Sequence, residues 1–135
     1  MSPTEVLVSV LALLGGEAKY LPPIDLVDIR PAYASEAAEA FTRAESNRIS
    51  LLTCTAAFRA AVRMDRWNAD AWPFIKLASI ITHEAWHVRH GPDERGAYEA
   101  QLFTLSRLGA GPGSRLHRGV RYSMLTVLKV KGSDP

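Results

Sequence analysis

The residues best suited to chemistry are His83, Glu84 and His87, in the stretch HEAWH. Histidines four positions apart on a helix project from one face, so His83 and His87 could bind one metal ion together. Glu84 follows the first histidine and could lie beside the ion without binding it. Zinc raises the acidity of a bound water molecule, from which Glu84 would accept a proton. The pattern predicts a Zn²⁺ site with two histidine ligands and a glutamate base.

A catalytic zinc site needs a third protein ligand and leaves its fourth position to water. His90 lies on the same predicted helix, about 10 Å beyond His83, too far to share its ion comfortably. Glu94 falls on the inward face of the next predicted helix, whereas Glu99 is placed for an exposed ion pair with Arg95. Glu94 is therefore the predicted third ligand and Glu99 the reserve. Two alternatives stay open: Asp93 and His90.

The C-terminal half of the chain, which must position these side chains, has a helical pattern. Apolar residues recur at three- and four-residue steps from 71 to 90, and Gly91-Pro92 ends the pattern. Asp70 is placed to cap this helix. Residues 94–108 predict a second helix that stops at a glycine-rich loop. Residues 114–130 form a last helix or a strand-like tail.

The N-terminal half predicts a short sheet between helices. The apolar run at residues 6–14 predicts a helix that Pro3 and Thr4 open and Gly15-Gly16 close, and residues 21–29 contain a short strand. The stretch RISLLTC, residues 48–54, is the best strand candidate, while the segment 38–44 before it is ambiguous between helix and strand. Residues 56–64 have apolar side chains at helical spacing. The order of helix, short sheet and further helices predicts an α+β fold.

Bulk properties restrict the class of protein. A chain of 135 residues predicts a single domain, 1–135, with a sizeable core. The net charge of +2 is too small to indicate nucleic acid or an anionic membrane as a partner. Cys54 is the only cysteine, which excludes an intrachain disulfide framework and a cysteine-based zinc site. These properties favour a cytoplasmic protein.

The apolar run at residues 6–14 could also be the core of a signal segment. The residues before it, MSPTE, include an acid and neither Lys nor Arg, which a signal peptide would carry. Nine residues are too few to span a bilayer. A helix of the domain is the favoured interpretation, and a cleaved signal is the alternative.

Residues 48–101 resemble the core of the zincin metallopeptidases. Zincins place an edge strand beside a helix that carries His-Glu-x-x-His. By this resemblance, residues 48–54 are the edge strand. The stretch ERGAY, residues 94–98, is similar to the Glu-x-x-Ala-Asp motif with which the gluzincin branch supplies its glutamate ligand, with Tyr98 in place of Asp.

Two departures favour the zincin superfamily over either of its branches. The gap between His87 and Glu94 is short for a gluzincin and nearer the metzincin spacing. The metzincin glycine, however, would fall at His90, and the third metzincin ligand at Asp93. The resemblance implies a minimal catalytic core that lacks the usual substrate-binding subdomain.

Further polar and aromatic residues could assist the site. Tyr98 could donate a hydrogen bond to a developing oxyanion, although a tyrosine at such a position is more often simply packed. His117 and Tyr122 could do the same with less support from their positions. The tryptophans are expected in the core or at helix contacts: Trp67, Trp72 and Trp86.

The favoured function is a zinc-dependent metallopeptidase that hydrolyses a peptide bond in a peptide or protein partner. His83, His87 and Glu94 would hold Zn²⁺, and Glu84 would act as general base. One alternative is a catalytically silent zinc-binding module with an interaction or regulatory role. Another is a basic helical module in which the His-Glu cluster is incidental.

Overall fold

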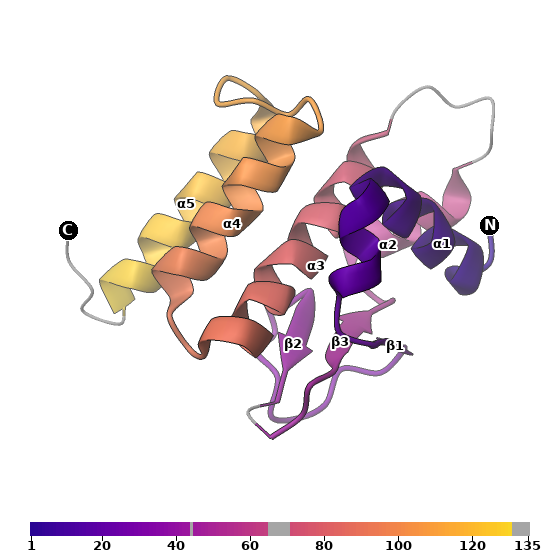
Figure 1. Cartoon of the computed structure of the whole chain (residues 1–135), viewed down its shortest axis with the longest axis horizontal. Helices are drawn as coiled ribbons and strands as arrows, with labels where there is room; N and C mark the ends of the chain where they lie inside the picture. The colour runs from indigo at the N-terminus through magenta and orange to yellow at the C-terminus, as the bar shows by residue number, and fades with distance from the viewer. Residues whose placement is uncertain (44, 65–70, 131–135) are drawn as a thin grey trace.

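The computed structural model of the chain describes residues 1–43, 45–64 and 71–130. Its elements follow in the order α1 (Pro3–Leu14), the 3-10 helix η1 (Gly15–Tyr20), β1 (Ile24–Val27), β2 (Ala40–Thr42), β3 (Ile49–Leu52), α2 (Ala56–Arg63), α3 (Trp72–His90), α4 (Glu94–Arg107) and α5 (Arg115–Val130). In Figure 1, α1, α2 and α3 lie over the strands, and α4 and α5 stand on the other side of α3. The predicted α+β class is confirmed. Asp70, the predicted cap, and Trp67 lie outside the described residues.

The sheet has three strands in the order β1-β3-β2, with β1 parallel and β2 antiparallel to β3. The prediction that residues 48–54 supply the edge strand is therefore wrong, because β3 is central. Its side chains explain this, since Ile49, Leu51 and Leu52 are fully buried, as suits a strand with neighbours on both sides. The edge beside α3 is β2, in the ambiguous segment 38–44.

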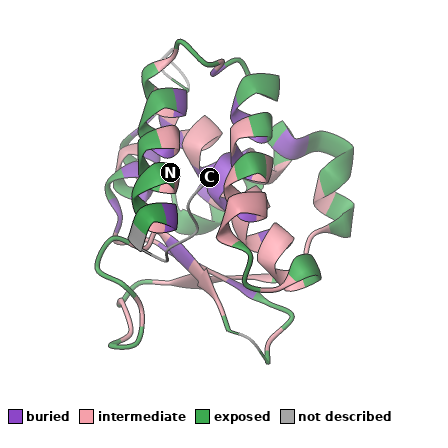
Figure 2. Cartoon of the chain, turned by 90° about the vertical axis from the view of Figure 1, so that its left-hand side faces the viewer, coloured by how far each residue is buried: buried purple, intermediate pink, exposed green. Residues whose placement is uncertain are grey.

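The main core fills the space between this sheet and α1, α2 and α3. Figure 2 shows buried residues on the inward sides of the helices and exposed residues on their outer sides. The fully buried members from helices and strands are Val6, Val10, Ile49, Leu51, Phe58, Ala61, Leu77, Ala78 and Ile81. Removing these apolar surfaces from water is the main favourable contribution to the stability of the fold.

The first helix begins at Pro3 and ends before Gly15, as predicted. Ser2 and Glu5 form a capping box, in which each side chain accepts a hydrogen bond from the other's backbone N–H. Three side chains at four-residue steps, Val6, Val10 and Leu14, point into the core. No helix within the described residues is both long enough and apolar enough to cross a membrane.

α3 is the longest helix, with 19 residues, and it contacts other elements on most of its surface. One side faces the sheet, α1 and α2, and the opposite side packs against α4. As a result, every residue from Leu77 to Ile81 is buried. A helix held from both sides is a rigid support for the side chains of its last turns.

α5 is joined to the rest of the molecule mainly through α4. A second apolar cluster, centred on Leu105, Ala110 and Val120, fills the contact between the two helices. Of the two predictions for residues 114–130, a helix or a strand-like tail, the helix is confirmed from Arg115 onward. Gly109, with φ of +101°, makes the sharp reversal that leads from α4 toward α5.

The central strand gives a test of the fold. Leu51→Ala removes a fully buried side chain and should lower the free energy of unfolding by about 2–5 kcal/mol. Leu125→Ala, on the exposed side of α5, is the matched control and should change it by less than about 0.5 kcal/mol. Urea denaturation followed by circular dichroism measures both. Equal effects would contradict the placement of β3 in the core.

Candidate metal centre

Three potential metal ligands meet where α3 ends and α4 begins. Nε2 of His83 lies 3.4 Å from Oε1 of Glu94, and Nε2 of His87 lies 2.5 Å from the same oxygen. Across the part of the chain that the structure describes, His83, His87 and Glu94 form the one group of metal-capable side chains close enough to share an ion, with ligand atoms within 4.8 Å. These are the two histidines and the third ligand predicted from the sequence.

The turn at Gly91 brings Glu94 to the histidines. Gly91 has φ of +85°, a conformation that residues with a Cβ rarely adopt, and its N–H donates to the carbonyl of His87 at 2.8 Å. Nδ1 of His87 donates to the carbonyl oxygen of Gly91 at 2.7 Å. The glycine thus ends α3 and also orients a ligand on its last turn.

A chain of three hydrogen bonds orients His83. Ser79 Oγ donates to the carbonyl of Lys76 at 2.7 Å, so it is free to accept from Nε2 of Gln101 at 3.3 Å. The Gln101 amide must then present its oxygen to Nδ1 of His83, 2.9 Å away, and this nitrogen is the donor. With both Nδ1 atoms engaged, both histidines direct Nε2 toward Glu94. Such outer partners fix ligand orientation in metal sites.

The electrostatics of the group keep Glu94 ionised and favour a proton on His87, which an ion bound there would displace. Hydrogen bonds from His83 and His87 hold the pKa of Glu94 well below its usual value, and they outweigh the opposing effect of burial. The hydrogen bond to Glu94 likewise raises the pKa of His87 above its usual value. Glu94 is therefore an ionised carboxylate at neutral pH, as a metal ligand must be.

The donor set suits zinc. Two imidazole nitrogens and one carboxylate oxygen are a ligand combination found in catalytic zinc sites. Ligand atoms bound tetrahedrally at about 2.1 Å stand about 3.4 Å apart, and His83 and Glu94 already have this separation. Nε2 of His87 is at hydrogen-bond distance from Glu94 and would separate from it when both bind an ion.

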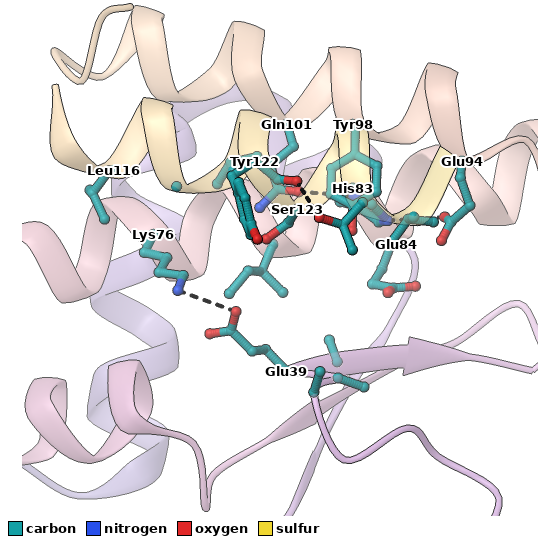
Figure 3. Close-up of a pocket in the computed structure, with 18 of the residues that line it drawn as sticks. Glu39, Lys76, His83, Glu84, Glu94, Tyr98, Gln101, Leu116, Tyr122 and Ser123 are labelled. Atoms are coloured by element: carbon teal, nitrogen blue, oxygen red, sulfur yellow. Dashed lines mark hydrogen bonds and ion pairs between the residues drawn. The ribbon is translucent and has the colours of Figure 1, made fainter. Parts of the chain in front are cut away.

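Glu84 lies beside this group without belonging to it. Its Oε2 accepts a hydrogen bond of 2.8 Å from Oγ1 of Thr42, on the edge strand β2. The carboxylate lines the cavity shown in Figure 3, next to His83. This is the arrangement expected of a base that acts beside a metal ion. Thr42 was missed by the sequence reasoning, because its partner is 42 positions away.

Tyr98 also faces the cavity and contacts a ligand. Its ring meets the ring of His83 edge to face, with centroids 4.6 Å apart. Burial, together with the negative charges of Glu94 and Glu84, raises the pKa of Tyr98 to about 12, so its phenol keeps its proton at neutral pH. Tyr122 lines the same cavity from α5, whereas His117 is buried on that helix.

The other candidate ligands lie apart from the group. Glu99 is exposed on α4, and Asp93 is exposed at the N-cap position of α4. His90 stacks on the indole of Trp86, with ring centroids 4.4 Å apart. Glu94 is thus the carboxylate that α4 presents to the two histidines.

Trp86 packs α3 against the first turn of α4 through Gly96. A Cβ added to Gly96 would come within 2.2 Å of the Trp86 ring, so this position has no room for a side chain. The close contact holds the turn of α4 that carries Glu94. Trp86 is therefore at a helix contact, as predicted, and Trp72 packs against the main core.

Comparisons of the chain with protein-family models, with curated proteins and with solved structures found no match. The resemblance of residues 48–101 to zincins therefore stays a prediction. The support for a metal centre is the geometry of the residues described above.

Replacing each candidate carboxylate tests the third ligand. Loss of a residue that only orients a ligand costs about 10–100-fold in metal affinity. Glu94→Ala removes a ligand itself and should therefore weaken zinc binding by more than that. Glu99→Ala should leave the affinity unchanged, because that side chain is exposed and outside the group. Competition with a fluorescent chelator measures both, and wild-type protein should bind one zinc ion. The reverse ranking would move the third ligand to Glu99.

Gln101 provides a test of the residues that orient the ligands through hydrogen bonds. Gln101→Leu keeps the approximate volume but removes the acceptor for Nδ1 of His83, and should lower zinc affinity about 10–100-fold. Thr104→Val is the matched control, since it removes a hydrogen bond to Thr82 at the same helix contact without touching a ligand. Similar losses in the two variants would mean that helix packing, and not ligand orientation, sets the affinity.

Proposed function

We propose that the protein is a zinc-dependent metallopeptidase that hydrolyses peptide bonds. The observation that carries the proposal is the convergence of His83, His87 and Glu94, with the carboxylate of Glu84 beside them in a cavity. A zinc ion held by the three ligands would supply Lewis acidity, which polarises a carbonyl group and acidifies water.

The side chains of this chain would carry the proton transfers. Glu84 accepts a proton from the attacking water and later delivers it to the nitrogen of the leaving amine. The hydrogen bond from Thr42 holds one carboxylate oxygen and so orients the other for this task. The protonated phenol of Tyr98, which lines the same cavity, would donate a hydrogen bond to the oxyanion that develops on the carbonyl.

A peptide is the substrate that best suits the surroundings of Glu84. Thr42 belongs to β2, which is an edge of the sheet and therefore has backbone groups directed away from β3. An extended peptide can pair with such an edge through main-chain hydrogen bonds, whatever its side chains. This would place a backbone amide next to the candidate base.

Replacing the candidate base separates an enzyme from a silent zinc-binding module. Glu84→Gln keeps the shape of the side chain but cannot accept the proton. Peptide hydrolysis should fall by about 10²–10⁴-fold, while zinc content stays near that of wild type because Glu84 is outside the ligand group. Mass spectrometry of a broad peptide library and metal analysis of the same samples give both results.

Glu99→Gln, on the exposed side of α4, is the control for the loss of a carboxylate and should keep full activity. Cleavage that persists unchanged in Glu84→Gln would place the chemistry elsewhere or reveal a contaminating protease. Wild-type protein that binds zinc but cleaves nothing in the library would favour the silent module.

A further inference from the structure

Two cavities meet at the candidate metal centre. The first, which we call the α5 arm, has a volume of about 640 Å³ and lies between residues 35–40, α3 and α5. The second, the loop arm, has a volume of about 580 Å³ and lies between β2, Asn47 and the Gly91-Pro92 turn. Both are lined by Ala40, His83, Glu84 and Glu94.

The arms extend in opposite directions from these shared residues. Along α3, the α5 arm is lined from Lys76 to Glu84, and the loop arm from His83 to Val88. The helix rises 1.5 Å per residue, so lining from Lys76 to Val88 covers about 18 Å. An extended peptide advances about 3.3 Å per residue, and this length therefore accommodates about five residues, on both sides of the metal centre.

The α5 arm has an apolar wall and a neutralised pair of charges. Ile80, Leu116 and Val120 line it, and Nζ of Lys76 pairs with Oε1 of Glu39 at 3.3 Å, as Figure 3 shows. Because the two charges compensate each other, neither is poised to select the charged end of a peptide. Arg115, an exposed residue at the start of α5, also lines the arm, so Arg115→Gln should change the cleavage of capped and uncapped peptides by the same factor. Side chains of a substrate would meet mainly apolar surface here.

The loop arm has an aromatic and polar border. Phe41 lines it and meets Tyr33 edge to face, with ring centroids 5.6 Å apart. The guanidinium of Arg43, an exposed residue, lies 5.6 Å from the centre of the Tyr33 ring. Arg43 is the one cation that lines this arm among the described residues, and it is the group to test for recognition of a terminal carboxylate.

We propose that a polypeptide passes through both arms and is cut at an internal bond, so that the protein acts as an endopeptidase. This inference rests on the proposed function. Hydrolysis adds hydroxide to the carbonyl carbon and a proton to the amide nitrogen as the C–N bond breaks. One new end leaves through each arm. An exopeptidase would need to hold a free terminus within one or two residues of the metal centre.

Capped peptides test the internal position of the cut. Peptides of about ten residues with acetylated and amidated ends should be cleaved near the middle, at rates within about threefold of uncapped versions, because no terminus is recognised. Capped tripeptides, too short to fill both arms, should be cleaved at least about tenfold more slowly. Release of single residues or dipeptides from uncapped ends alone, blocked by capping, would overturn the proposal.

Plugging each arm separately tests whether both are used. Gly119→Trp narrows the α5 arm, where an added Cβ meets nothing within 4 Å, and Asn47→Trp narrows the loop arm from an exposed position. Each should lower kcat/KM for capped peptides by at least about tenfold. Gly113→Trp, also free of contacts within 4 Å, is the control outside both arms and should retain activity. Loss in one plugged variant only would contradict the two-arm path.

Two further measurements keep the outcomes distinct. Arg43→Gln should change the cleavage of capped and uncapped peptides by the same factor, and a loss confined to uncapped peptides would reveal recognition of a terminal carboxylate. Zinc-loaded wild-type protein that cleaves no peptide, capped or uncapped, would refute the proposed function itself. Cleavage restricted to termini and abolished in Glu84→Gln would refute the endopeptidase inference alone.

Discussion

Two imidazoles and a carboxylate share a small, largely buried space at the junction of α3 and α4. The surrounding residues supply the hydrogen bonds that these polar groups require once they are removed from water. The three side chains are only 12–20% exposed, and polar groups so placed are costly unless they are hydrogen-bonded or bind an ion. Gly91 and Gln101 meet this need on one side of each imidazole ring. Glu94, or an ion that it helps to bind, meets it on the other.

The same requirement explains one part of the polar contact between α3 and α4, the hydrogen bond between Ser79 and Gln101. Helix pairs usually pack through apolar side chains, but here Ser79 meets Gln101 and Thr82 meets Thr104 through hydrogen bonds. Gln101 can orient His83 only because its own amide is held by Ser79. A network in which every member has a partner gives a precise geometry, whereas an incomplete one would be costly.

α3 combines stability and chemistry on one helix. Ile81 and Ala85 face the main core, while His83, Glu84 and His87 face the cavities. Because the apolar side is fixed by the sheet and by α1 and α2, the polar side is held at a defined distance from β2. The direct hydrogen bond between Thr42 and Glu84, 2.8 Å long, depends on this support. The proposed endopeptidase path rests on the same geometry, since β2 and α3 border both arms.

Local spacing in the sequence is enough to predict several features of the candidate site. Four-residue steps predict that His83 and His87 share a helix face, and the apolar periodicity of the following helix singles out Glu94 over Glu99. The glycine at position 91 and the apolar runs indicate the helices and the presence of β3, though not its place in the sheet. Each of these features depends on residues close together in the chain, where backbone geometry fixes which side chains can meet.

Contacts between residues far apart in the chain depend on the tertiary structure. The strand order, which makes β3 central and β2 the edge, depends on how three short segments pack under α3, and short strands carry little information about their neighbours. Thr42 and Gln101 lie 42 and 18 positions from the side chains they orient. Nothing in their local pattern identifies these partners. The physical reason is that such hydrogen bonds form only after the core has placed the helices and the sheet against one another.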